Sequence, residues 1–200
     1  RVFQNILKKK KIIIGSQNCY QKDPFSSNTG AISSYMLKSI GARYTLVGHS
    51  DNRTEGDTDQ ILKDKVKFAL ENGLKVVFCI GENKKDKKNN KTLIVLKKQI
   101  NKLLEKKINK KNVIIAYEPI WSIGTGKIPS AFELKRTTTH IKKVLKDIFK
   151  INIPPVLYGG SVDGNNIKMF KQIREIDGFL IGGASKSDKK FIDIIKNYYR

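Results

Sequence analysis

Two side chains that can move protons come directly after apolar segments of the chain. His49 follows Tyr44–Gly48, and Glu118 follows Val113–Tyr117. Imidazole and carboxylate groups are common general acids and bases in enzymes. His140, the second of only two histidines, lies in a lysine-rich segment expected to be helical. Taken singly, His49 could be a structural histidine and Glu118 a solvated acid in a turn. Their shared position after apolar segments makes both candidates for catalysis.

Glycine-rich turns follow two further apolar segments. Gly159–Gly160–Ser161 comes after Pro155–Tyr158, and Gly182–Gly183 comes after Gly178–Ile181. Because glycine has no Cβ, the backbone N–H groups of such turns can approach a phosphate closely. The two turns together predict an anion site, although tight turns between a strand and a helix also use glycine for purely structural reasons.

The segment just beyond Glu118 is typical of a loop that closes over a ligand. Ile120–Lys127 places Gly124 and Gly126 on either side of Thr125. It is not a nucleotide-binding P-loop, because the glycine that should precede it is missing and Lys127 is not followed by Ser or Thr. Since no Cys/His group has the spacing of metal ligands, we expect no metal ion.

Short apolar runs that alternate with amphipathic segments predict how these residues are positioned. The expected strands are Ile12–Gly15, Tyr44–Gly48, Val76–Ile80, Val113–Tyr117, Pro155–Tyr158 and Gly178–Ile181. The expected helices are Asp59–Glu71, Leu93–Ile108 and Phe132–Phe149, with Arg1–Lys10 as the end of a further helix. This order predicts an α/β protein with a parallel sheet. Active sites of such proteins lie at the carboxyl ends of the strands, where the candidate residues fall.

Composition limits the class of protein. The chain has 200 residues, enough for one domain, and a net charge of +22. Lysine supplies 34 of the 40 basic residues, and Lys, Ile and Asn together make up 76 residues. Phosphate recognition favours arginine, so we interpret this charge as a compositional bias and nucleic-acid binding as the weaker alternative.

No apolar run approaches the ~18 residues of a membrane span. Cys19 and Cys79 are too few for a disulfide scaffold, which suits a reducing compartment.

The sequence resembles the triosephosphate isomerase family over essentially its whole length. The segments that carry the resemblance are GSQNCY (Gly15–Tyr20), VGHSDNR (Val47–Arg53), VVFCIGE (Val76–Glu82), AYEPIWSIGTGK (Ala116–Lys127), LYGGSV (Leu157–Val162) and DGFLIGGAS (Asp177–Ser185). The resemblance implies a TIM-type (β/α)8 barrel with about six of its eight βα units, forming one domain over residues 1–200 that is incomplete at its amino terminus. It also implies interconversion of dihydroxyacetone phosphate and D-glyceraldehyde 3-phosphate through an enediolate, without a cofactor.

Roles for individual residues follow from the same resemblance. Glu118 corresponds to the base that removes a proton from carbon, and His49 to the neutral electrophile that polarises the carbonyl. The residues corresponding to donors to the substrate phosphate are Gly124, Ser161, Gly182 and Gly183. The lid consists of Pro119, Ile120, Trp121, Ser122, Ile123, Thr125, Gly126 and Lys127, together with Gly124. Cys79 and Glu82 match neighbouring positions that we interpret as structural.

Three departures from the family pattern bear on activity and assembly. No Asn-x-Lys string stands where the family has its catalytic lysine, Asp51–Asn52 replaces Glu-Arg, and Ala31 replaces a glutamate. We therefore expect this 200-residue form to be impaired. The loop Gln17–Gly30 predicts a homodimer, weaker than is usual in the family.

Two other functions stay open at this point. One is a catalytically impaired isomerase-like protein with a binding or regulatory role, and the other is the basic nucleic-acid-binding protein. We expect a cytoplasmic location and no membrane partner. A plastid or another organelle remains open, because a targeting segment would lie in the missing amino-terminal part.

Overall fold

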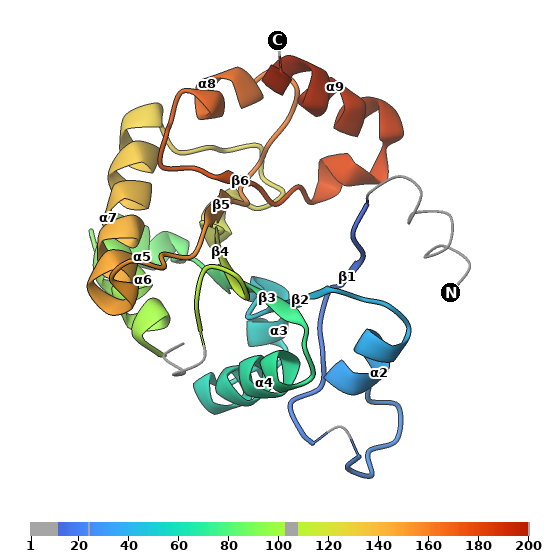
Figure 1. Cartoon of the computed structure of the whole chain (residues 1–200). Coiled ribbons are helices and arrows are strands. Elements are labelled where there is room, and N and C mark those ends of the chain that lie inside the picture. The colour runs from blue at the N-terminus through green and yellow to red at the C-terminus, as the bar shows by residue number, and fades with distance from the viewer. Residues whose placement is uncertain (1–11, 24, 103–107, 200) are drawn as a thin grey trace. The chain divides into compact units, whose positions relative to one another are not determined.

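Strands and helices alternate along the chain in the computed structural model, which describes residues 12–23, 25–102 and 108–199 (Figure 1). The strands form one six-stranded sheet whose order, β1-β2-β3-β4-β5-β6, is the order of the sequence. The registers of β1 with β2, β2 with β3, β4 with β5 and β5 with β6 are all parallel. The predicted parallel α/β architecture is confirmed.

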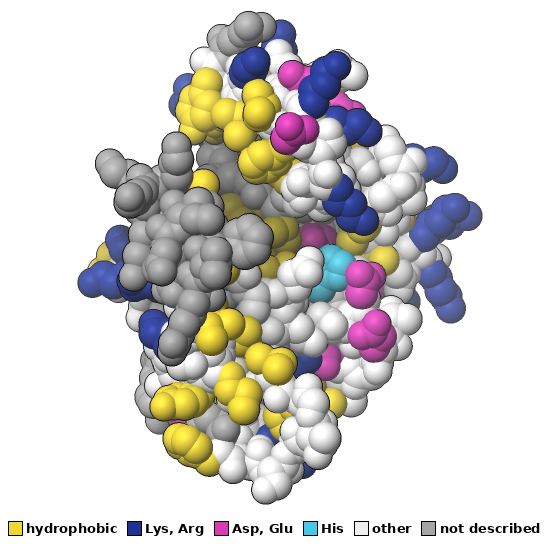
Figure 2. Space-filling view, turned by 90° about the vertical axis from the view of Figure 1, so that its right-hand side faces the viewer, with side chains coloured by type: hydrophobic (Ala, Val, Ile, Leu, Met, Phe, Trp, Pro, Cys, Tyr) yellow, Lys and Arg dark blue, Asp and Glu magenta, His cyan; other side chains and the backbone are white. Residues whose placement is uncertain are grey.

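The first of two compact units contains the described residues up to 79 and those from 101 to 114. Its elements are β1 (Gly15–Ser16), α2 (Ser34–Ser39), β2 (Tyr44–Val47), α3 (Ser50–Thr54), α4 (Asp59–Glu71) and most of β3 (Lys75–Ile80). Helix α4 begins after Thr58, whose side chain accepts a hydrogen bond from the backbone N–H of Ile61. Its face formed by Leu62, Val66 and Ala69 is buried. Apolar side chains gather over α2, in the lower part of Figure 2.

The second unit contains residues 80–100 and the described residues from 115 onward. Its elements are α5 (Lys84–Lys88), most of α6 (Thr92–Lys102), most of β4 (Val113–Tyr117), the 3-10 helix η1 (Ile120–Ser122), α7 (Ala131–Phe149), β5 (Val156–Tyr158), α8 (Ile167–Lys171), β6 (Gly178–Phe179), the 3-10 helix η2 (Gly183–Lys186) and α9 (Asp188–Tyr199). A capping box fixes the start of α7, since Ser130 and Glu133 each accept a hydrogen bond from the other's backbone N–H.

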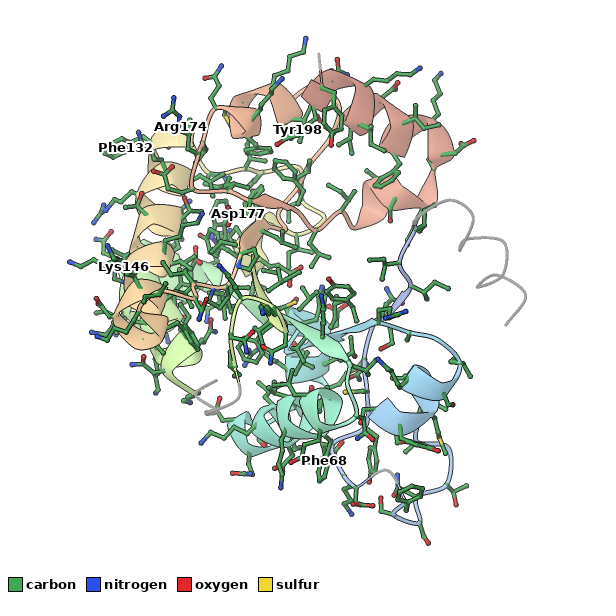
Figure 3. The ribbon with its side chains drawn as sticks, viewed as in Figure 1. Phe68, Phe132, Lys146, Arg174, Asp177 and Tyr198 are labelled. Carbon is green, nitrogen blue, oxygen red and sulfur yellow. The ribbon has the colours of Figure 1, made fainter. Side chains whose placement is uncertain are left out.

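A chain of aromatic rings joins the strands of the second unit to its last helices. The ring centroids of Tyr158 and Phe170 are 4.8 Å apart, and those of Phe170 and Phe179 are 6.1 Å apart. Tyr198 of α9, labelled in Figure 3, extends the chain with its ring 5.7 Å from that of Phe179. Because Tyr158 and Phe170 are almost fully buried, these contacts hold α8 and α9 against β5 and β6.

Several predicted boundaries were wrong. Strand β1 begins at Gly15, whereas the prediction was Ile12–Gly15, and Ile12 and Ile13 are 55% and 60% exposed. Strand β6 ends at Phe179, two residues before the predicted end. A strand extends only as far as its backbone pairs with a neighbour, and an apolar run does not report that limit.

The helix predicted over Leu93–Ile108 is α6, which begins at Thr92 and is described to Lys102. Ile108 lies outside any helix, and the helix end predicted for Arg1–Lys10 lies outside the described residues. The expectation of one domain over 1–200 stays a prediction. Among the described helices, none has the length and apolar character needed to cross a membrane.

Candidate active site

Glu118 lies immediately after β4, where the chain leaves the buried sheet of the second unit. Its backbone N–H donates to the carbonyl oxygen of Ile80 at 2.8 Å, so pairing with β3 reaches the residue itself. Glu118 is only 5% exposed. A Cβ added at Gly159, directly after β5, would lie 2.7 Å from Cγ of Glu118. The side chain that carries the carboxylate therefore packs against the end of the neighbouring strand, at a place where only glycine leaves room.

The lid, residues 119–127, begins beside Glu118 and is anchored at its first turn. The indole Nε1 of Trp121 donates to Oε1 of Glu82 at 2.8 Å, and the backbone N–H of Ile120 donates to the Glu82 carbonyl at 3.0 Å. Burial raises the pKa of the Glu82 carboxyl, while the hydrogen bond from Trp121 opposes that rise. Lys87 of α5 lies 3.4 Å from the Trp121 ring centroid and 3.7 Å from the carboxylate of Glu133 in α7. Glu82 therefore contacts the edge of the indole, and Lys87 lies over its face.

The far end of the lid contacts the turn after β5. The backbone N–H of Gly126 donates to Oγ of Ser161 at 3.2 Å, and that hydroxyl donates to the carbonyl of Ser122 at 2.6 Å. Gly124 and Gly126 have φ angles of +67° and +73°, which favour glycine. Residues 124–127 are exposed, whereas Ser122 is fully buried.

The predicted phosphate donors differ in how accessible they are. Gly182 and Gly183 are exposed, and a Cβ built on either would meet nothing within 4 Å. The same open space surrounds Gly124 in the lid. The N–H of Ser161 instead donates to Oγ of Ser122 at 3.3 Å, a long hydrogen bond. Three of the four positions therefore leave room for a ligand beside the backbone, and the fourth already has a weak partner.

His49 lies in the first unit, two residues after β2, and caps α3. Its Nδ1 accepts a hydrogen bond from the backbone N–H of Asp51 at 3.2 Å. A ring nitrogen that accepts must keep its lone pair, so the ring proton belongs on Nε2, which is then the donor. The Asp51 carboxylate oxygen Oδ2 is 3.5 Å from the same Nδ1, but its side chain is 81% exposed. Solvent screens that exposed carboxylate, so the amide contact is the stronger influence on the ring.

Arg53 joins the residue before His49 to strand β3. Its Nε donates to the Gly48 carbonyl at 2.7 Å, and its Nη2 donates to the Cys79 carbonyl at 3.0 Å. Gly48 has a φ of +79°, and a Cβ there would lie 2.8 Å from Nη2 of Arg53. The turn that presents His49 therefore depends on glycine and on the half-buried guanidinium together.

Within the second unit, the structure places the candidate residues after three successive parallel strands. Glu118 follows β4, Ser161 follows β5, and Gly182 and Gly183 follow β6. His49 follows β2 in the first unit. The roles given to these residues stay predictions.

His140 lies in α7, where burial lowers its pKa, and it is not one of the residues at the strand ends. The described residues contain no group of His, Cys, Asp and Glu suited to a metal ion.

Sequence reasoning missed the partners of the lid. Glu82 is interpreted there only as structural, and Lys87 is not singled out at all. One signal was available: Trp121 is the only tryptophan, and a half-buried indole N–H usually needs an acceptor. The lysine had no such signal, because its neighbours in sequence are equally basic.

Comparisons with known proteins agree with one another. A family model described as triosephosphate isomerase matches residues 1–198. Triosephosphate isomerase from Yarrowia lipolytica is 40% identical over 194 residues, which cover 96% of this chain and 78% of that protein. The Saccharomyces cerevisiae enzyme of the same name is 38% identical over 197 residues, covering 96% and 79%.

A solved structure shows the same relation in three dimensions. The crystal structure of triosephosphate isomerase from Bartonella henselae superposes with a TM-score of 0.89 and 34% sequence identity. The match covers 98% of this chain and 80% of that one. The predicted fold class is therefore confirmed.

Proposed function

The chain belongs to the triosephosphate isomerase family, and on that premise we propose which of its residues interconvert dihydroxyacetone phosphate and D-glyceraldehyde 3-phosphate. Glu118 removes a proton from the carbon next to the substrate carbonyl. The electron pair of that C–H bond becomes part of the C=C bond of an enediolate, and the negative charge moves to oxygen. His49 gives its Nε2 proton to that oxygen and takes up the hydroxyl proton of the neighbouring oxygen. Glu118 then returns its proton to the carbon that carried the carbonyl. The electron pair of the C=C bond forms this C–H bond while a lone pair of the other oxygen forms the new C=O bond, which completes the isomerisation.

The burial of Glu118 is the observation that carries this proposal. A carboxylate that is 5% exposed and packed on Gly159 has few water contacts, which makes it a better proton acceptor than a solvated one. The contact from the Asp51 N–H to His49 Nδ1 supports the second role, because it leaves the proton on Nε2.

The substrate phosphate binds, in this proposal, to backbone N–H groups of Gly124, Ser161, Gly182 and Gly183. The open space around the three glycines supports that assignment. Closure of residues 119–127 excludes water and holds the enediolate against loss of its phosphate. The contacts of Gly126 and Ser122 with Ser161 support the lid role.

Replacing the base tests the proposal. In the full-length protein, Glu118→Gln removes the proton acceptor but keeps the shape of the side chain, so we expect kcat to fall by about 10²- to 10⁴-fold with a much smaller change in KM. Glu71→Gln, in the exposed end of α4, is the matched control and should behave as the parent chain does. Near-normal turnover by Glu118→Gln would eliminate Glu118 as the base.

A homodimer through Gln17–Gly30 is the second part of the proposal. The base of this loop is closed by the bond from the Tyr20 N–H to the Ile32 carbonyl at 2.9 Å. Phe25 in the loop is 78% exposed, and its ring lies 5.3 Å from that of Tyr35 in α2. Exposed apolar residues next to this loop, Ile32, Tyr35 and Met36, support burial against a second copy.

The comparisons favour the isomerase over both alternatives, the impaired relative and the nucleic-acid-binding protein. A cytoplasmic location stays a prediction.

A further inference from the structure

We propose that the hydroxyl group of Ser122 is a positioning element of the lid, tying both lid ends to the turn after β5. This proposal rests on the proposed function, because it concerns the loop that would close over the substrate. Ser122 is buried, with 0% exposure, and the glycines two and four residues later are exposed. A fully buried polar side chain needs hydrogen-bond partners, and Ser122 has them.

The hydroxyl of Ser122 uses its whole hydrogen-bonding capacity. A serine hydroxyl has one proton to donate and two lone pairs that accept. The proton goes to the Lys127 carbonyl, 2.5 Å away at the other end of the lid. The lone pairs face the Ser161 N–H at 3.3 Å and the Tyr158 hydroxyl at 3.5 Å, both on or beside β5. One atom therefore joins the first turn of the lid, its last residue and the strand behind it.

The backbone of Ser122 takes part in the same junction. Its carbonyl accepts from Oγ of Ser161 at 2.6 Å, so Ser161 donates two hydrogen bonds to Ser122, one from its N–H and one from its hydroxyl. Gly160 makes the close approach possible, since a Cβ at that position would lie 2.8 Å from Oγ of Ser122 and 2.1 Å from the Tyr158 hydroxyl. The intervening residues 123–126 are consequently held as a loop with both ends fastened at one place.

Removal of the hydroxyl should loosen the lid without weakening substrate binding. Ser122→Ala deletes the bonds to Lys127 and Ser161 but keeps the carbonyl that accepts from Ser161. The Ser161 N–H, one of the four proposed phosphate donors, then has no competing acceptor. We expect kcat to fall about three- to tenfold, the effect of one typical hydrogen bond, while KM does not rise.

Hydrogen exchange measures how firmly the lid is held by these hydrogen bonds, and it needs no substrate. Amide exchange of Gly126 and Ser161 should be about three- to tenfold faster in Ser122→Ala than in the parent chain. Thr138→Val is the matched control. Thr138 is also fully buried, and its hydroxyl donates to the Leu134 carbonyl at 2.8 Å, but it lies inside α7 away from the lid. When samples with the same folded fraction are compared, this variant should leave amide exchange at Gly126 and Ser161 unchanged, and kcat as well.

The outcomes separate this proposal from the proposed function. Unchanged exchange at Gly126 and Ser161 in Ser122→Ala overturns the fastening role. Faster exchange with an unchanged kcat overturns the positioning role in catalysis. The parent chain could fail to isomerise triose phosphates while the Gly126 and Ser161 amides of Ser122→Ala still exchange faster. That result would support the role of Ser122 in holding the lid and would contradict the proposed function.

Discussion

Gly81, which directly follows β3, offers a way to displace Glu118 without altering its side chain. A Cβ at Gly81 would lie 1.8 Å from the carbonyl oxygen of Glu118 and 2.7 Å from its carbonyl carbon. Both are backbone atoms, so no rotation of a side chain can relieve the overlap. The substitution Gly81→Ala therefore acts on the backbone that carries the proposed base.

The overlap can be relieved only by movement of the backbone at Gly81, at Glu118 or at both, and Gly81 is held by Gln99. The side-chain amide of Gln99 accepts from the Gly81 N–H at 2.9 Å and donates to its carbonyl at 3.0 Å. A Cβ contact below 3.0 Å is essentially never seen, so residue 81 and the Glu118 carbonyl have to separate by at least ~1.2 Å. Misplacement of a catalytic group by ~1 Å can cost about 10²-fold in rate, equivalent to ~2.7 kcal/mol of barrier.

We therefore expect Gly81→Ala to lower kcat by about 10²-fold. It should also lower the free energy of unfolding by about 1–3 kcal/mol, so turnover must be measured where circular dichroism shows the variant to be folded. Gly178→Ala in β6 is the control, since the Cβ there meets only the Leu157 side chain, at 3.0 Å. A folded Gly81→Ala variant that turns over within threefold of Gly178→Ala would refute the claim that Glu118 must be held in place to act.

Two further predictions concern assembly and the thiols. Each chain carries a net charge of +22, so the proposed dimer should dissociate more readily at low salt and become tighter as salt screens the repulsion. Sedimentation across a salt series measures this. A dimer that becomes tighter when salt is removed would contradict the prediction. Burial raises the pKa of Cys19 to about 11, so at pH 8 only about one thiol in a thousand is ionised. Iodoacetamide should therefore leave Cys19 unmodified in the native chain but alkylate it in urea. Equal rates of alkylation under the two conditions, measured by mass spectrometry, would contradict the burial.

The sequence predicted those parts of the site that depend on the order of elements. Glu118 and the turn after β5 could be located because each comes where a buried apolar run stops, and parallel strands bring such points to one edge. The ends of β1 and β6 could not be located, because pairing with a neighbour sets them and apolar character does not. The contacts of Lys87 and the hydroxyl of Ser122 depend on residues distant in sequence, so no local pattern could reveal them.

Solvent-proton exchange tests the central claim that Glu118 moves a proton on carbon. Dihydroxyacetone phosphate is incubated in D2O with the parent chain, with Glu118→Gln and with Glu71→Gln, and the products are followed by proton NMR. The account predicts D-glyceraldehyde 3-phosphate carrying deuterium at C2 from the parent and from Glu71→Gln, with a rate lower by about 10²-fold or more from Glu118→Gln. Deuterium incorporation by Glu118→Gln at the parental rate would contradict it.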